Sequence, residues 1–156
     1  MDKKKVAALC MLFLPWLTVP ILGKKAFIRF FPAASLANLC MIILSVIANK
    51  KKWWRNKNPL TPNVPIDFTY ILGAHFVATL WVFKLTYGSF PLYLLVNTIF
   101  DFINAFPFAG MWKKIGFFKF KKMSPTMYSF LTIMLAVVIY IYQSAVEKVI
   151  RNKNNI

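Results

Sequence analysis

Long apolar runs alternate with short basic or turn-forming stretches along the whole chain. Each run approaches the roughly 20 residues that a helix needs to cross a bilayer. The pattern therefore predicts an all-α integral membrane protein, a bundle of five transmembrane helices in a single domain of residues 1–156. The predicted spans are residues 6–22, 30–48, 66–83, 90–112 and 125–146.

The first segment, residues 6–22, is the least regular of the five. Pro15 and Pro20 should kink or fray its second half, because proline removes a helical hydrogen bond. The run follows "MDKKK" as a signal peptide would, but no small-residue cleavage site follows it. We therefore expect an uncleaved first span. The alternative is four spans plus a kinked or re-entrant N-terminal helix.

Turn and loop signals separate the later spans. Pro32 falls where the first turn of the second helix would tolerate proline. The stretch "KLTYGSF" is short enough to join the third and fourth spans as an antiparallel hairpin. Two basic and aromatic stretches, "NKKKWWRNKN" and "KKIGFFKFKK", are predicted to be loops at the membrane surface, with Trp53 and Trp54 as interfacial anchors. Residues 147–156 are predicted to be a polar tail.

The composition supports a membrane location and argues against nucleic-acid binding. Hydrophobic residues make up 59% of the chain and charged residues 15%, against about 45–50% and about 25% in soluble domains. The net charge of +16 alone would suggest a nucleic-acid partner. However, the basic residues flank apolar runs instead of forming a face. We therefore expect the lipid bilayer and its anionic lipids as partners, and no nucleic acid.

The distribution of Lys and Arg predicts the orientation in the membrane. With five spans, the N-terminus, the second loop and the fourth loop share one side and hold three, five and five basic residues. The other side holds seven. Because Lys and Arg are retained on the cytoplasmic side, we expect the N-terminus in the cytoplasm and the C-terminus outside. With only four spans the two sides would hold equal numbers.

One predicted span carries polar residues that a lipid-facing helix would not tolerate. Asn97, Asp101 and Asn104 are spaced i, i+4 and i+7 in the fourth span, and thus lie within an arc of about 60° on one helix face. An Asp at the centre of a spanning helix costs roughly 2.5–3.5 kcal/mol. This face is therefore predicted to point into the bundle.

The third span carries the only histidine, His75, with Thr79 one turn on and Asp67 two turns back. Counting about 1.5 Å per residue from the span ends places His75, Asp101 and Asn38 in one layer near the membrane midplane. His75 is therefore the predicted partner of Asp101. The alternative is that these polar residues only hold helices together, at about 0.6 kcal/mol per pair.

The sequence contains no enzyme signature, and one histidine is too few for an intramembrane metal centre. We therefore expect no enzyme activity, metal or cofactor, and Cys10 and Cys40 as packing residues. The leading hypothesis is a membrane protein that handles protons or a small solute, or senses through titration, at the polar layer. The alternative is a non-catalytic accessory subunit of a larger membrane complex, with another membrane protein or further copies of itself as partner.

Three stretches, "PWLTVPILGKKAFIRFFPAA", "KKKWW" and "FKLTYGSFPLYLLVNTIFDFI", carry a resemblance to known proteins. They resemble small multi-pass membrane proteins of low-GC Gram-positive, spore-forming bacteria. The resemblance covers most of the chain and implies a location in the bacterial plasma membrane. It carries no activity over to this chain.

Overall fold

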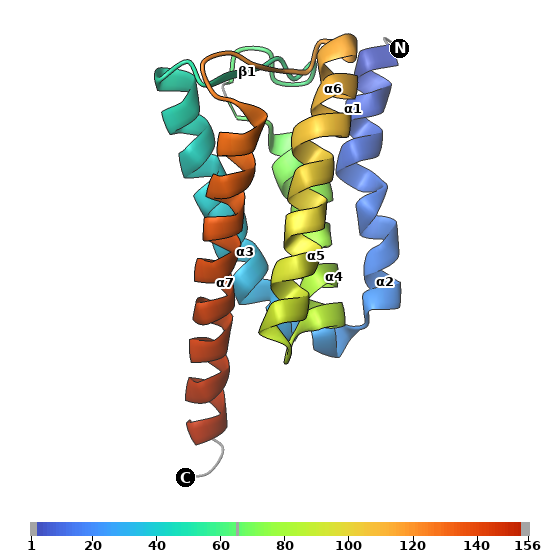
Figure 1. The fold of residues 1–156 in the computed structure, drawn as a ribbon. Coiled ribbons are helices and arrows are strands. Elements are labelled where there is room, and N and C mark those ends of the chain that lie inside the picture. Colours follow the sequence, from blue (N-terminus) through green and yellow to red (C-terminus); the bar gives the residue numbers. More distant parts are fainter. Residues whose placement is uncertain (1–2, 65, 154–156) are drawn as a thin grey trace.

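The computed structural model describes residues 3–64 and 66–153. Its helices run up and down along one axis, with the start of α1 and a small sheet at one end and the end of α7 at the other (Figure 1). The 3₁₀ turn η1 and the π-helical segments η2 and η3 interrupt the α-helices. The helical elements are α1 (Lys3–Phe13), η1 (Pro15–Thr18), α2 (Val19–Leu22), α3 (Lys24–Lys50), η2 (Tyr70–His75), α4 (Phe76–Thr86), α5 (Phe90–Ile103), η3 (Asn104–Phe108), α6 (Ala109–Ile115) and α7 (Pro125–Lys153). The predicted all-α class is confirmed.

Helix length and surface both fit a membrane location. Among the described residues, four helical stretches are long and apolar enough to cross a membrane, namely Lys3–Leu22, Lys24–Lys50, Phe90–Ile115 and Pro125–Lys153. A fifth stretch, Tyr70–Thr86, is apolar but shorter. All five expose large apolar side chains on the outside of the bundle. Apolar surface of this extent is typical of a surface that lipid or another protein covers.

The first helical stretch is interrupted where its prolines lie, as predicted. Pro15 begins the 3₁₀ turn η1, and Pro20 lies in the first turn of the short α2. The stretch nevertheless extends along the bundle beside α4 (Figure 1). It packs closely because Gly73 has no side chain: a Cβ there would overlap the backbone of Met11 and Leu12.

The second helix starts earlier than predicted. α3 begins at Lys24 instead of residue 30, because Gly23 adopts a φ of 85° that ends α2 and turns the chain directly into the next helix. Pro32 therefore lies inside α3 and not in its first turn, so that prediction is wrong. α3 packs against α4 and α7 and supplies Asn38 to the interior.

The third helix is shifted towards its C-terminal end, to Tyr70–Thr86 instead of 66–83. Asp67 fixes its start, because its Oδ1 accepts a hydrogen bond from the backbone N–H of Tyr70 at 3.2 Å. At the far end the chain reverses at Gly88, which has a φ of 105°. α5 then begins at Phe90 and packs against α4. The predicted antiparallel hairpin is confirmed.

The last two predicted spans end too early. The span 90–112 is helical to Ile115, where Gly116 adopts the left-handed conformation with a φ of 87°. The span 125–146 continues to Lys153, so the described part of the predicted polar tail is helical. Residues 154–156 of that tail lie outside the described residues. The C-terminal end of α7 reaches beyond the other helices (Figure 1).

The two stretches predicted to be loops meet in a two-stranded antiparallel sheet. Its strands are β1 (Trp54–Asn56) and β2 (Phe118–Phe120), and the register pairs Trp54 with Phe120, Arg55 with Lys119 and Asn56 with Phe118. Trp54 is 4% exposed and packs edge-on against Tyr128 of α7. Trp54 is therefore part of a small interior and not the interfacial anchor predicted for it. We call β1, β2 and their flanking loops the cap.

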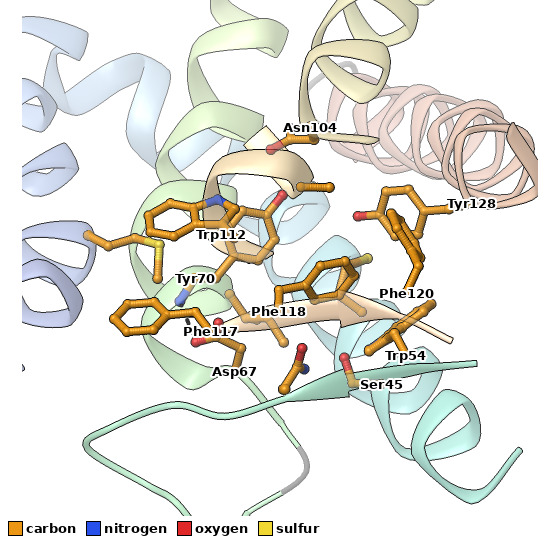
Figure 2. A pocket seen from close by; sticks show the side chains of 15 residues that line it. Ser45, Trp54, Asp67, Tyr70, Asn104, Trp112, Phe117, Phe118, Phe120 and Tyr128 are labelled. Atoms are coloured by element: carbon orange, nitrogen blue, oxygen red, sulfur yellow. Dashed lines mark hydrogen bonds between the residues drawn. The ribbon is translucent and has the colours of Figure 1, made fainter. Parts of the chain in front are cut away.

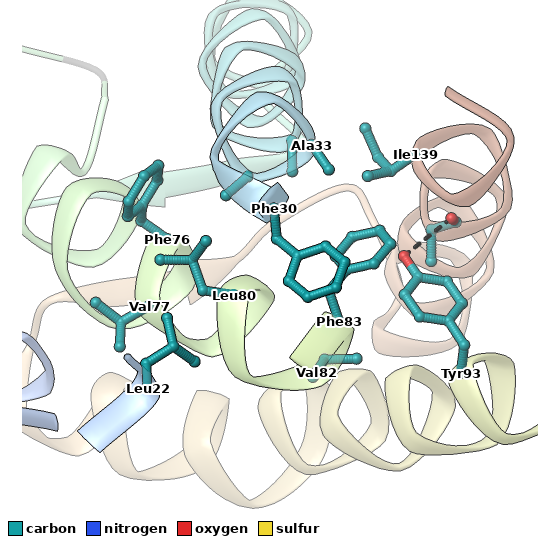
Figure 3. Close-up of a cluster of buried hydrophobic side chains, with 13 residues drawn as sticks. Leu22, Phe30, Ala33, Phe76, Val77, Leu80, Val82, Phe83, Tyr93 and Ile139 are labelled. Atoms are coloured by element: carbon teal, nitrogen blue, oxygen red, sulfur yellow. Dashed lines mark hydrogen bonds between the residues drawn. The ribbon is translucent and has the colours of Figure 1, made fainter. Parts of the chain in front are cut away.

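At the end away from the cap, the bundle has a dense core of aromatic and aliphatic side chains (Figure 3). Phe83 of α4 lies at its centre, with ring centroids 4.9 Å from Tyr93, 5.5 Å from Phe30 and 6.4 Å from Tyr140. The Tyr93 hydroxyl donates to the backbone carbonyl of Ala136 at 3.1 Å. This cluster joins α3, α4, α5 and α7 and fixes their mutual positions.

Candidate functional site

A small polar cavity lies between α3, α4, α5 and α7. Its volume is about 50 Å³, and its polar lining includes His75, Thr79, Asn97, Asp101 and Thr132. A water molecule occupies roughly 30 Å³ in the liquid, and a cavity with several polar partners can hold it. This cavity, which we call the inner cavity, therefore has room for one or two water molecules.

His75 is held at the wall of the inner cavity by a residue of another helix. Its Nδ1 lies 2.8 Å from Oδ1 of Asn38, which is 6% exposed. Because an amide oxygen only accepts hydrogen bonds, Nδ1 is the protonated nitrogen in this arrangement, and Nε2 is left to accept a proton. The Tyr70 ring packs against the imidazole at a centroid distance of 5.8 Å. His75 is thus fixed in position with one nitrogen available.

Asp101 lies on the same inner cavity, but not with the partner predicted from the sequence. Within the described residues, no hydrogen bond or ion pair joins it to His75, whose partner is Asn38. The Asp101 carboxyl instead lies close to the Thr132 hydroxyl on α7, which itself donates to the backbone carbonyls of Tyr128 and Ser129. The cause is helix packing: α5 lies against both α4 and α7, and Asp101 is on the side that meets α7. Asp101 and His75 share the cavity without a hydrogen bond or an ion pair between them.

The two amides that flank Asp101 lie at different depths. Asn97 lines the inner cavity and donates to the Tyr93 carbonyl of its own helix at 2.8 Å. Asn104 lies one turn nearer the cap and lines a second cavity, with its amide donating to the Phe100 carbonyl at 3.0 Å. The helix face was inferred correctly for Asn97 and Asp101, but the three residues do not form one site.

Thr79 and Asp67 have structural roles. The Thr79 hydroxyl lines the inner cavity and donates to the His75 carbonyl at 2.8 Å. Asp67 lines the second cavity, where its Oδ1 accepts hydrogen bonds from the Asn58 amide at 2.8 Å and from the Thr69 hydroxyl at 2.7 Å. Asp67 thereby ties the loop after β1 to the start of the third helix.

The second cavity, which we call the cap cavity, lies under the small sheet (Figure 2). Its volume is about 70 Å³. Seven of its fifteen described lining residues are aromatic, and Asp67, Asn104, Asn56 and Ser45 add polar groups. The aromatic residues that line it are Trp54, Tyr70, Trp112, Phe117, Phe118, Phe120 and Tyr128.

Three side chains, Met41, Tyr70 and Tyr128, line both cavities and therefore lie between them. The two tyrosine hydroxyls lie close to each other. Tyr128 is held from the cap side by Trp54 and Phe120, with ring centroids 5.7 Å and 5.6 Å away. A pair of hydroxyl groups thus separates the cavity next to the cap from the cavity that contains Asp101.

Sequence reasoning missed Tyr70, Tyr128 and Thr132. Their hydroxyls lie within apolar runs, where tyrosine and threonine are ordinary packing residues. The π-helical segment η2, which contains Tyr70 and His75, has no signal in the residue pattern. Both π-helical segments contribute to the cavity walls, η2 to both cavities and η3 through Asn104. Such segments are frequent at functional sites.

Residues 3–64 and 66–153 contain no group of three His, Cys, Asp or Glu side chains that could hold a metal ion. No protein-family model, curated protein or solved structure matches the chain. The function of this protein is therefore inferred from the geometry of its cavities and of its charged surface.

Proposed function

We propose that this chain is a multi-pass protein of the bacterial plasma membrane that transfers protons through the inner cavity. One observation carries the proposal: a carboxyl group, Asp101, and an imidazole, His75, line the same water-sized cavity at mid-depth in an apolar bundle. Both groups take up and release protons, and ionisable residues at membrane depth commonly mark ion or proton pathways.

The size of the inner cavity favours a proton over an organic solute. At about 50 Å³ it is far smaller than the roughly 300–1,000 Å³ of pockets that bind drug-sized molecules. Water in this space would connect Asp101 with Nε2 of His75, since the two side chains share the cavity but have no direct bond. Proton movement through such a water is compatible with the fixed positions of both residues.

The tyrosine pair indicates the end of the bundle from which protons would reach the inner cavity. Tyr70 and Tyr128 lie between the inner cavity and the cap cavity, and a phenol hydroxyl both donates and accepts hydrogen bonds. The basic residues at the cap end favour the cytoplasmic side of the membrane. We therefore infer that the inner cavity exchanges protons with the cytoplasm, with the N-terminus inside and the C-terminus outside. A reporter enzyme that is active only outside the cytoplasm, fused to the C-terminus, tests this orientation.

Proton flux into liposomes that contain the purified protein tests the proposal. We expect the parent to carry flux under an imposed membrane potential, and Asp101→Asn to abolish it. Glu147→Gln is the matched control, because it makes the same change at the end of the bundle where Glu147 pairs with Arg29. Equal flux in the parent and in Asp101→Asn would overturn the proposal.

The dense core favours a second candidate function, the sensing of cytoplasmic pH. The aromatic cluster around Phe83 and Tyr93 lies between the inner cavity and the end of the bundle away from the cap. Protons can therefore reach the inner cavity from the cap side. A sensor needs access from one side only. A parent protein that carries no flux, but whose Asp101 exchanges its proton with water, would favour sensing over transfer.

A further inference from the structure

A groove on the surface of the cap is lined by basic and amide side chains. It has a volume of about 610 Å³ and lies between the start of α1, the end of α3, β1 and the loop that follows β1. Its basic residues are Lys4, Arg55 and Lys57. Four asparagines, Asn49, Asn56, Asn58 and Asn63, supply amide groups. None of the described lining residues is acidic.

The register of the sheet concentrates positive charge beside this groove. Arg55 of β1 is paired directly with Lys119 of β2, and both side chains are exposed. Like charges at directly opposite positions destabilise an antiparallel pair, and a two-stranded sheet has little stability to spare. Neither side chain has a carboxylate partner among the described residues. An anion bound at this position would relieve the repulsion.

One carboxylate, that of Asp67, lies beneath the groove, but it forms no ion pair with Arg55 or Lys57. Asp67 lies under the cap, where its Oδ1 already accepts hydrogen bonds from Asn58, Thr69 and the backbone of Tyr70. Asn58 is consequently held in place as part of the groove wall and is 2% exposed. Arg55, Lys57, Asn49 and Asn63 remain exposed and able to donate hydrogen bonds to a ligand.

The donors in the groove match a phosphate ester. Arg presents a planar fork of N–H groups that pairs with phosphate oxygens, and Lys adds a point charge. Asparagine amides can hydrogen-bond to both phosphate and hydroxyl groups. β1 and the loop after it, which line the groove, lie at the end of the apolar helices (Figure 1). This is the depth where phospholipid headgroups lie if these helices span the bilayer. Leu60, in the loop beside the groove, exposes an apolar side chain there.

We propose that this groove binds the headgroup of an anionic phospholipid, with Arg55 and Lys57 contacting the phosphate. The site does not depend on the proton-transfer proposal, since it shares no residue with the inner cavity. Binding at this site differs from a general attraction between basic loops and acidic membranes. The preference for an anionic lipid depends on Arg55 and Lys57 in particular, among the many cations of the cap.

The binding of short-chain phosphatidylglycerol and phosphatidylcholine to the purified protein, in a non-ionic detergent, tests the site. We expect the parent to prefer phosphatidylglycerol. A hydrogen bond to a charged group contributes roughly tenfold or more to affinity, so Arg55→Gln with Lys57→Gln should lose about 100-fold. The matched control is Lys121→Gln with Lys122→Gln, an equal change of charge at the same end of the bundle but outside the groove, which should keep the parent's affinity.

Three results would overturn the site. The first is an equal loss in the groove variant and the control variant, which would mean diffuse attraction only. The second is the absence of any preference for phosphatidylglycerol in the parent. The third is binding of inorganic phosphate as tight as that of the lipid, which would identify a free anion as the ligand. If the double variant does not fold, Lys57→Gln alone serves, with an expected loss of about tenfold.

Discussion

The two halves of the bundle are built in different ways. Away from the cap, the bundle consists of the regular helices α3, α4, α5 and α7 around a cluster of packed aromatic rings. At that end Arg29 and Glu147 form an ion pair, with N···O distances of 2.5 Å and 2.8 Å. Towards the cap, two helices change to π-helical turns at η2 and η3, and both interior cavities lie there. We call these the aromatic half and the cap half.

This difference separates the residues that hold the structure from those available for chemistry. Interlocked aromatic rings leave no space for water, and they fix the four helices on which the polar residues lie. A π-helical turn inserts a residue and redirects side chains, which opens space beside the helix. A densely packed half that fixes the helices carrying the polar residues provides the support that a precise functional site requires.

The largest effect on stability is expected from Phe83→Ala in the aromatic half. The substitution removes the ring at the centre of the cluster. We expect a loss of about 3 kcal/mol, the lower end for buried phenylalanines, because lipid is as apolar as the protein interior and only packing is lost. Thermal unfolding in detergent measures it. A loss no larger than for exposed Phe130→Ala would contradict the role of the cluster.

A smaller loss is expected where the first helix packs on η2. In Gly73→Ala the new methyl group would overlap the backbone of Met11 and Leu12, so α1 must move away. Overpacking of this kind costs about 1–3 kcal/mol. Gly110→Ala is the control, since a Cβ there meets no atom within 4 Å and alanine is the better helix former. Equal stability of the two variants would show that α1 is not packed as described.

The smallest change in stability, with a specific change in function, is expected at the boundary of the two cavities. Tyr70→Phe and Tyr128→Phe each remove one hydroxyl of the pair, at a cost of about 1 kcal/mol. If protons pass between the cavities through these hydroxyls, both variants should slow the proton flux. Tyr140→Phe, in the aromatic half, is the control and should leave flux unchanged. Equal flux in all three variants would exclude the hydroxyl pair from the path.

Much of the fold could be predicted from the sequence, because apolar length and Pro or Gly positions act locally. The hairpin at Gly88 and the interruption at Pro15 follow from such signals. The residues at which helices begin and end were harder to predict from the sequence. Pro32 inside α3 and the helical residues up to Lys153 depend on what the chain packs against and not on local preference. The sheet requires two loops that are distant in the sequence to meet, which residue patterns do not encode.

The candidate site could be predicted only in part. The spacing of Asn97 and Asp101 gave a correct helix face, and depth counting brought Asn38 and His75 into the same layer, where they are bonded. Counting along helices gives depth but not rotation. It therefore could not show that Asp101 faces Thr132 on α7, or that Asn104 lies on the neighbouring cavity.

The central claim is that Asp101 lies beside water in the cap half of the bundle and exchanges its proton there. Infrared spectroscopy of the reconstituted protein tests this directly, because the C=O band of a protonated carboxyl shifts in D₂O once its proton has exchanged. We predict a band that titrates with pH, shifts in D₂O and is missing in Asp101→Asn, while Glu147→Gln retains it. Identical carboxyl spectra for the parent and Asp101→Asn at every pH, or a band that D₂O does not shift, would contradict the claim.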